Sequence, residues 1–304
     1  MAGKRALLFD PGPNIGDNCR AFILFKAFGL ANPELELTCW LSPEVEAKLG
    51  PLLRASRAVD RFVTADRSPG LTLELNQDLL KRMMGRSKEL SWRNCPPGQG
   101  PDGREYDLVI PTGEPWLTAK LLSGRGLKEA ETINQGRFLA LLLELSQAQA
   151  AQAVPLFGNR SGPEELLTVG LCRPEPDDPK QLPASRRQLI WEMILKSGFR
   201  AVAMDLQDWS PPPDSARIRD LRSAGLTEKV EVFNRALVHI GTDGGLLHFA
   251  AACGCPTLGF YHGPERDPGL IHSPWPRSGE WGGHLSSRKF KDYIELLRDI
   301  LKLK

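Results

Sequence analysis

The chain has 304 residues, which is enough for two domains of roughly 150 residues each. Its 39 Lys and Arg residues nearly balance its 37 Asp and Glu residues, and the formal charge of +2 argues against nucleic acid or an anionic membrane as the main partner. No apolar stretch approaches the roughly 18–20 residues that a membrane-spanning helix needs. The first residues lack the pattern of a secretory signal, so we expect a cytoplasmic protein with at most peripheral membrane contact.

The N-terminal half alternates short apolar strands with helices. The pattern predicts strands at 5–9, 35–41, 59–64 and 106–110. It predicts helices at 18–30, from Pro43 to near Gly50, and near 72–84, 114–123 and 137–150. Residues 10–17 are expected to form a loop between the first strand and the first helix. The alternation favours a parallel sheet covered by helices on both faces.

Residues 85–104 interrupt this alternation. They are rich in glycine, proline and basic side chains, and we expect them to form a loop. Gly98, Gly100 and Gly103 match the spacing G-x-G-x-x-G, but the match neither follows a predicted strand nor opens a helix. It therefore does not indicate a dinucleotide site.

The strand and helix pattern restarts after Pro155. A strand is predicted at 166–172, a helix at about 184–197 and a second strand at 200–206. Two such halves predict an α/β protein of two doubly wound, Rossmann-like domains that face each other across a central cleft. We place these domains at 1–155 and 156–286. We expect the C-terminal helix, within 287–304, to cross back to the N-terminal domain.

The strongest local signal is the segment Thr242–Gly245, which lies between a predicted strand and a helix of small residues. Paired glycines at a helix start let backbone N–H groups approach an anion, and the helix dipole favours the negative charge of a phosphate. The alternative is a tight turn in which Asp243 only caps the helix. The nearby Cys253-Gly-Cys255 lacks the second pair of ligands of a structural zinc site, so no metal is expected.

Other short motifs lie along the chain at Asn14-Ile-Gly-Asp17, Tyr106–Ile110, Asp177–Lys180 with Pro183, Gly254-Cys-Pro256 and Gly263–Gly269. Together with Asp243-Gly-Gly-Leu-Leu-His248, they resemble in order the motifs of glycosyltransferase family 9, the heptosyltransferases of lipopolysaccharide core assembly. Gly244 and Leu247 stand where that family usually has Thr and Ser, and the segment 207–236 is shorter than the family's.

The resemblance implies a GT-B fold and an inverting, metal-independent glycosyltransferase. Such an enzyme transfers a sugar, here a heptose from an ADP-heptose-like donor, to a hydroxyl acceptor, and it needs no cofactor besides the nucleotide-sugar co-substrate. The implied general base is Asp17, and the alternative is that Asp17 only caps the helix that follows. The implied ligands of the donor and its phosphates are Lys180, Thr242, Asp243, Gly244, Gly245, Leu246, His248 and His262. His248 could instead fix the turn through a hydrogen bond to a backbone carbonyl.

The N-terminal domain should hold the acceptor, a small-molecule or lipid-linked saccharide of lipopolysaccharide or natural-product biosynthesis. The candidate acceptor residues are Asn14, Arg57, Arg61, Arg86 and Arg93, although a solvated basic face explains the arginines equally simply. Two other functions stay open. One is a nucleotide-sugar epimerase of similar fold, and the other is a non-catalytic nucleotide-binding descendant. We expect a monomer.

Overall fold

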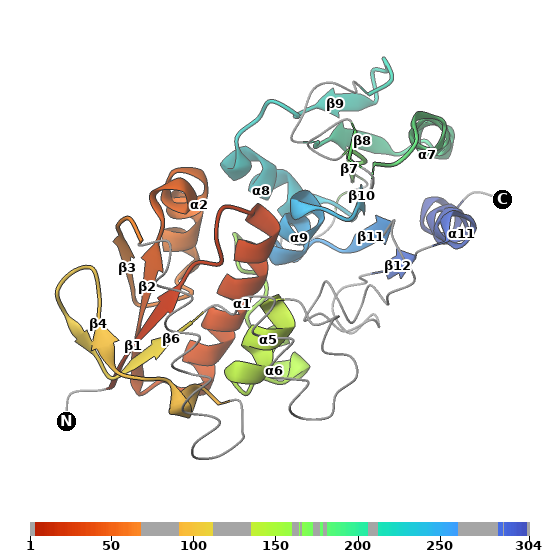
Figure 1. The fold of residues 1–304 in the computed structure, drawn as a ribbon. Coiled ribbons are helices and arrows are strands. Elements are labelled where there is room, and N and C mark those ends of the chain that lie inside the picture. The colour runs from red at the N-terminus through yellow and green to blue at the C-terminus, as the bar shows by residue number, and fades with distance from the viewer. Residues whose placement is uncertain are drawn as a thin grey trace. The chain divides into compact units, whose positions relative to one another are not determined.

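A computed structural model of the chain describes residues 4–67, 91–111, 135–159, 164, 166–172, 177–178, 181–205, 212–260, 285–287 and 289–302 (Figure 1). These residues form two compact units, which divide between Leu156 and Phe157. Each unit is built on its own parallel sheet. Within the described ranges, no helix is long and apolar enough to cross a membrane. The cleft predicted between the two domains stays a prediction.

The first unit contains a four-stranded parallel sheet in the order β3-β2-β1-β6. Its strands are β1 (Lys4–Phe9), β2 (Leu35–Leu41), β3 (Arg61–Thr64) and β6 (Leu108–Ile110). The four residues from Ala6 to Phe9 of β1 are buried, as expected for a strand with helices on both faces. Ala6 pairs with Leu37 of β2 on one side and with Leu108 of β6 on the other.

The helices of the first unit are α1 (Ile15–Ala31), α2 (Pro43–Ser56), α5 (Gln135–Leu142) and α6 (Gln147–Gln152), and α5 and α6 lie against α1 (Figure 1). Three predictions about them were wrong in their bounds. Helix α1 begins three residues earlier than predicted, so residues 15–17 are helical. Helix α2 continues past Gly50, and the single helix predicted at 137–150 is two helices. The helices predicted near 72–84 and 114–123 lie outside the described residues.

The part of the predicted loop 85–104 that the structure describes has regular structure. It contains a short 3-10 helix, η1 (Trp92–Asn94), and the strand β4 (Gly98–Gln99), which pairs antiparallel with β5 (Glu105–Tyr106). Gly103 has a φ of +74° between these two strands, a conformation that favours glycine. The glycines of the G-x-G-x-x-G spacing therefore lie in a hairpin.

The second unit contains a six-stranded parallel sheet in the order β12-β11-β10-β7-β8-β9. Its strands are β7 (Leu166–Gly170), β8 (Arg200–Ala203), β9 (Ile218–Asp220), β10 (Val238–Thr242), β11 (Thr257–Phe260) and β12 (Leu285–Ser287). Helices lie on both sides of this sheet (Figure 1). They are α7 (Ala184–Ser197), α8 (Leu226–Arg235), α9 (Gly245–Ala252) and α11 (Phe290–Leu301).

The C-terminal helix α11 packs inside the second unit, and the prediction that it crosses back to the first was wrong. Its buried residues Tyr293, Ile294, Leu297 and Leu301 belong to one hydrophobic core with residues of β7, β10, β11 and α7. The Tyr293 ring lies 5.4 Å from the Phe260 ring of β11. This packing buries the apolar face of α11.

Both sheets are wound in the same way. The first strand of each unit, β1 or β7, lies inside its sheet, with the next strands on one side and a later strand, β6 or β10, on the other. In open α/β sheets, ligands bind at the carboxyl ends of the strands where this reversal occurs. The residues that follow β1, β7 and β10 are therefore the first place to look for a site.

Candidate active site

The segment Thr242–Gly245 lies at the strand reversal of the second sheet. Thr242 is the last residue of β10, and both Thr242 and Asp243 are buried. The backbone N–H of Asp243 donates to the carbonyl oxygen of Phe260 at 2.9 Å, which holds the turn against the end of β11. Gly244 is the N-cap of α9 and has no side chain that could accept a hydrogen bond from the helix. Gly244 therefore caps no backbone N–H group at the start of α9 through a side chain, and anion binding at this helix start stays a prediction.

Leu246 and His248 lie in the first turns of α9 and are buried. The Leu246 side chain lies close over Gly170 of β7, where a Cβ atom would come within 2.6 Å of its Cδ2 atom. Leu246 thus helps to seat the helix on the sheet. A buried Leu246 contributes packing at this turn, whatever its role toward a ligand.

The sequence did not indicate a second buried carboxyl group, that of Asp205. It lies after β8, which pairs with β7 in the same sheet. Asp205 follows the end of β8, is 4% exposed, and its Oδ1 accepts a hydrogen bond from the backbone N–H of Cys172 at 2.8 Å. Burial raises the pKa of Asp205 to about 7, against the opposing effect of hydrogen bonds from Cys172 and of the charges on Arg222 and Arg187. The available signal was a single acidic residue within the apolar segment predicted as a strand at 200–206, although β8 itself ends at Ala203.

In the first unit, Asn14 and Asp17 lie at the N-terminus of α1. Asn14 is the N-cap residue, and its Nδ2 donates to the Asp17 Oδ2 at 3.3 Å. Asp17 forms an ion pair with Arg20, and its side chain is 25% exposed. The first turn of a helix favours a carboxylate, because the positive end of the helix dipole lies there. Asp17 therefore lies on the first turn of the helix and not in the predicted loop.

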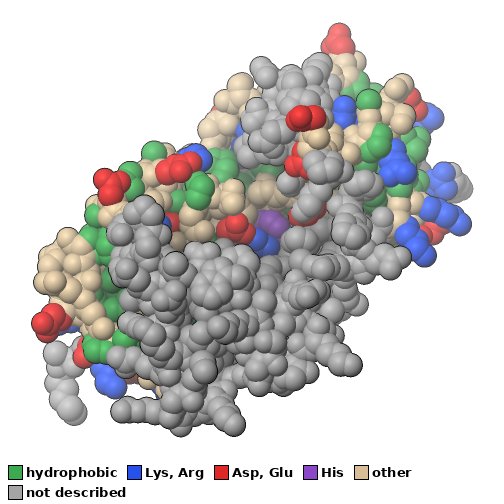
Figure 2. All heavy atoms as spheres, viewed as in Figure 1, with side chains coloured by type: hydrophobic (Ala, Val, Ile, Leu, Met, Phe, Trp, Pro, Cys, Tyr) green, Lys and Arg blue, Asp and Glu red, His purple; other side chains and the backbone are tan. Residues whose placement is uncertain are grey.

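Three of the predicted acceptor arginines, Arg57, Arg61 and Arg93, lie within the described residues, and two of them form ion pairs. Arg61 donates to Asp102 at 2.7 Å, and Arg93 forms an ion pair with Glu144 and lies over the Trp92 ring. Arg57 is exposed at the end of α2. On the face drawn in Figure 2, basic and acidic side chains of the described residues are interspersed. The paired arginines are better explained as surface ion pairs.

Three predicted site residues, Lys180, Arg86 and His262, lie outside the described residues. Among the residues that the structure does describe, no group of three or more His, Cys, Asp or Glu side chains could hold a metal ion. The cysteines at 253 and 255 are buried and form no disulfide.

No protein-family model matches the sequence, and no curated protein matches it. Solved structures do match over nearly the whole chain. Heptosyltransferase WaaC from E. coli with ADP is 14% identical, has a TM-score of 0.56, and aligns over 97% of this chain and 99% of its own. The chain has the GT-B fold of the heptosyltransferases.

Two further structures support this fold. The glycosyl transferase family 9 protein from Veillonella parvula DSM 2008 is 14% identical with a TM-score of 0.55, over 100% of this chain and 91% of its own. The E. coli ADP-heptose lps heptosyltransferase II is 14% identical with a TM-score of 0.52, over 98% of each chain. The resemblance to family 9 that the sequence motifs indicate is confirmed at the level of the fold.

Proposed function

We propose that this chain is an inverting glycosyltransferase that transfers a heptose from an ADP-heptose-like donor to a hydroxyl of a saccharide acceptor. The observation that carries the proposal is the Thr242–Gly245 turn, which presents the N-terminus of α9 at the strand reversal of the second sheet. An ADP-linked donor is supported by WaaC, a protein of the same fold that is described with ADP. In this proposal the second unit binds the donor and the first unit binds the acceptor.

The proposed reaction is a single displacement. Asp17 accepts the proton of the acceptor hydroxyl as its oxygen attacks the anomeric carbon, and the bond from that carbon to the nucleotide diphosphate breaks. One displacement at the anomeric carbon inverts its configuration. The negative charge that develops on the diphosphate is met by the backbone N–H groups and dipole of α9 and by Lys180. The charge can be stabilised by these groups alone, without a metal ion.

Binding of nucleotides tests the donor half of the proposal. We expect ADP and ADP-heptose to raise the melting temperature of the protein more than UDP, GDP and their sugars do, in a thermal-shift panel at matched concentrations. A ligand at 100 times its dissociation constant stabilises the folded protein by roughly 2.7 kcal/mol, which such a panel detects. No shift with any of these ligands would count against a donor site.

A product assay with the nucleotide sugar that binds best separates the alternatives. It measures conversion of the sugar and release of ADP, with and without an acceptor. An epimerase converts the nucleotide sugar without an acceptor and releases no ADP. A non-catalytic descendant binds the nucleotide and leaves its sugar unchanged. Release of ADP that depends on an added acceptor supports the glycosyltransferase.

A further inference from the structure

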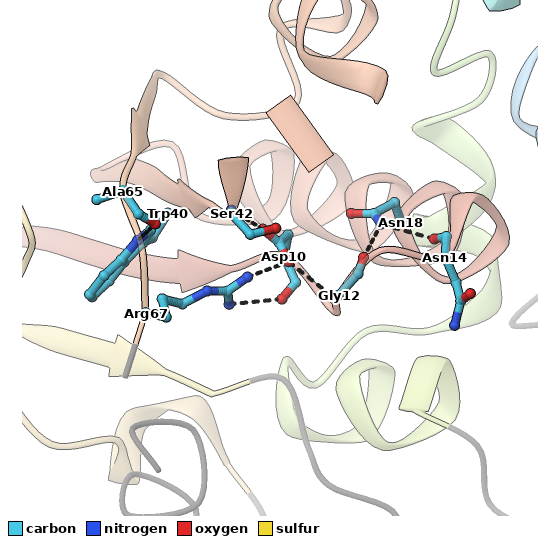
Figure 3. Close-up of polar contacts among 8 residues, drawn as sticks. All are labelled: Asp10, Gly12, Asn14, Asn18, Trp40, Ser42, Ala65 and Arg67. Carbon is cyan, nitrogen blue, oxygen red and sulfur yellow. Dashed lines mark hydrogen bonds and ion pairs between the residues drawn. The ribbon is translucent and has the colours of Figure 1, made fainter. Parts of the chain in front are cut away.

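A second aspartate of the β1–α1 turn, Asp10, forms an ion pair that the proposed reaction does not use. Asp10 directly follows β1 and is 1% exposed. Its Oδ1 accepts a hydrogen bond from the backbone N–H of Gly12 at 2.9 Å, and its Oδ2 accepts one from the backbone N–H of Ser42. Arg67 forms an ion pair with the same carboxylate and donates to the Asp10 carbonyl oxygen at 3.1 Å. Figure 3 shows these donors converging on Asp10.

This arrangement joins three segments at one edge of the sheet. Gly12 follows β1, Ser42 follows β2, and Arg67 follows β3. The segment that carries Arg67 is held in turn, because the Trp40 Nε1 donates to the carbonyl oxygen of Ala65 at 2.9 Å (Figure 3). One buried carboxylate therefore fixes the relative positions of the segments at the carboxyl ends of three neighbouring strands.

The turn that Asp10 holds at one end is held at the other by Asn18. The Asn18 Nδ2 donates to the carbonyl oxygen of Gly12 at 2.6 Å and to that of Asn14 at 2.9 Å, and Asn18 is fully buried. Gly12 has a φ of +105°, a backbone conformation that other residues adopt only with strain. The path of the turn is thus specified by side chains on both sides of a glycine that allows it.

Asp17 is attached directly to this turn. It precedes Asn18 in α1 and accepts a hydrogen bond from Asn14, whose carbonyl oxygen Asn18 also holds. We propose that Asp10, held by Arg67, is a positioning residue that fixes Asp17 for proton transfer. This inference rests on the proposed function. Asp10 itself is a poor candidate for the base, because its carboxylate is buried and each of its oxygens already accepts a hydrogen bond.

A buried ion pair adds little net stability compared with an apolar pair of the same size, because both charges lose their hydration. The Asp10–Arg67 pair instead fixes the positions of the segments around it, because the Asp10 carboxylate accepts hydrogen bonds from several directions at once. A displacement of about 1 Å at a reacting group can lower a rate by about 100-fold. The proposed role of the pair is therefore to fix the turn, and removing only one partner also destabilises the fold because it leaves the other without its partner.

The first test is a kinetic comparison of Asp10→Asn with wild type. We expect kcat to fall by about 10- to 100-fold while the KM for the donor stays within about twofold, because the turn is displaced and the donor turn of the second unit is untouched. Arg67→Gln should show the same split, Arg67→Lys should recover part of kcat, and the double variant should be no worse than the poorer single one. Unchanged kcat in Asp10→Asn, or a loss of donor binding equal to the loss of kcat, would overturn the inference.

The matched control is Asp60→Asn. Asp60 also accepts a hydrogen bond from a backbone N–H, that of Leu37 at 2.7 Å, but it lies away from the β1–α1 turn. This variant removes an exposed carboxylate that also holds a backbone N–H of the same unit, and its kcat should stay at the wild-type value because the β1–α1 turn is untouched. A fall in kcat equal to that of Asp10→Asn would mean that any loss of stability in this unit lowers the rate.

The second test does not depend on activity. Amide hydrogen exchange followed by mass spectrometry should be faster in Asp10→Asn than in wild type for peptides that cover residues 11–18, and unchanged for peptides that cover α9. Asp60→Asn should leave exchange at residues 11–18 unchanged. Equal exchange at residues 11–18 in Asp10→Asn and wild type would overturn the positioning role. Failure of wild type to transfer a sugar would contradict the proposed function separately.

Discussion

Three aspartates, two that follow strands and one in the first turn of α1, differ in what surrounds them. Asp17 is a quarter exposed beside Arg20, whereas Asp10 is buried against Arg67 and Asp205 is buried against the backbone of Cys172. The sequence singles out only Asp17, because its motif is contiguous. Arg67 lies 57 residues from Asp10, and Cys172 lies 33 residues from Asp205. Contacts over such separations depend on the pairing of strands, which a local pattern does not determine.

The raised pKa of Asp205 makes the stability of the protein depend on pH. The unfolded chain releases this proton near the ordinary value of 3.8, but the folded protein keeps it up to about pH 7. The folded state therefore binds more protons between these values, and this carboxyl group destabilises the fold increasingly as the pH rises from about 4 to 7. Above pH 7 a buried negative charge remains.

Asp205→Asn should remove this dependence. The amide oxygen can still accept from the Cys172 N–H, so we expect the variant to match wild type near pH 4 and to be more stable above pH 7, by a few kcal/mol at most. Urea unfolding at a series of pH values measures the difference. Parallel stability curves for the two proteins would show that Asp205 titrates normally.

Asp220→Asn is a control of opposite sign. Hydrogen bonds from the Arg222 side chain hold the pKa of Asp220 below its usual value, so its stabilising effect is present at neutral pH and is lost as the pH falls. This variant should lose stability at pH 7 relative to wild type and approach it in acid. A gain at pH 7 would contradict the proposed electrostatics of this end of the sheet.

At the scale of elements, the sequence predicted where helices of the described residues occur better than it predicted where they begin and end. Helix α2 continues through Pro51 because Val45, Leu49 and Leu53 are buried at positions four residues apart, and this packing outweighs the missing backbone hydrogen bond. The single helix predicted at 137–150 is interrupted where Glu144 has a φ of +57°. Ser146 and Gln149 then form a capping box that starts α6. That Ser/Gln spacing was visible in the sequence.

The N-terminus of α9 offers a test of anion binding at this scale. Gly244 has an extended backbone, with φ at 179°, so an aspartate fits its conformation and is a favourable N-cap. We expect Gly244→Asp to fold normally and to weaken ADP binding by at least about 10-fold, because its carboxylate occupies the N–H groups and repels the phosphates. Isothermal titration calorimetry measures the dissociation constant.

Gly225→Asp is the matched control for this variant. Gly225 is the N-cap of α8, and a Cβ atom added there meets no heavy atom within 4 Å. The substitution should stabilise α8 and leave ADP binding unchanged. Equal ADP affinity in wild type and Gly244→Asp would show that the start of α9 does not bind the diphosphate.

At the scale of the whole molecule, the alternation of strands and helices predicted the two α/β halves and the restart of the pattern after Pro155. The structure divides its units after Leu156. The surface against which α11 packs could not be predicted in the same way. Its apolar face shows that it must pack somewhere, but only the assembled second unit, with Phe260 and Ile190 in the same core, supplies the surface that it covers.

The central claim is that a base in the first unit and a donor in the second act in one displacement. Its most direct test is sugar transfer from ADP-heptose to a saccharide acceptor, with the product's anomeric configuration read by NMR, in wild type and Asp17→Asn. We predict an inverted product from wild type. In the variant, kcat should fall by at least about 100-fold, with the dissociation constant for ADP within about twofold. A product of retained configuration, or equal transfer by the two proteins, would contradict the account.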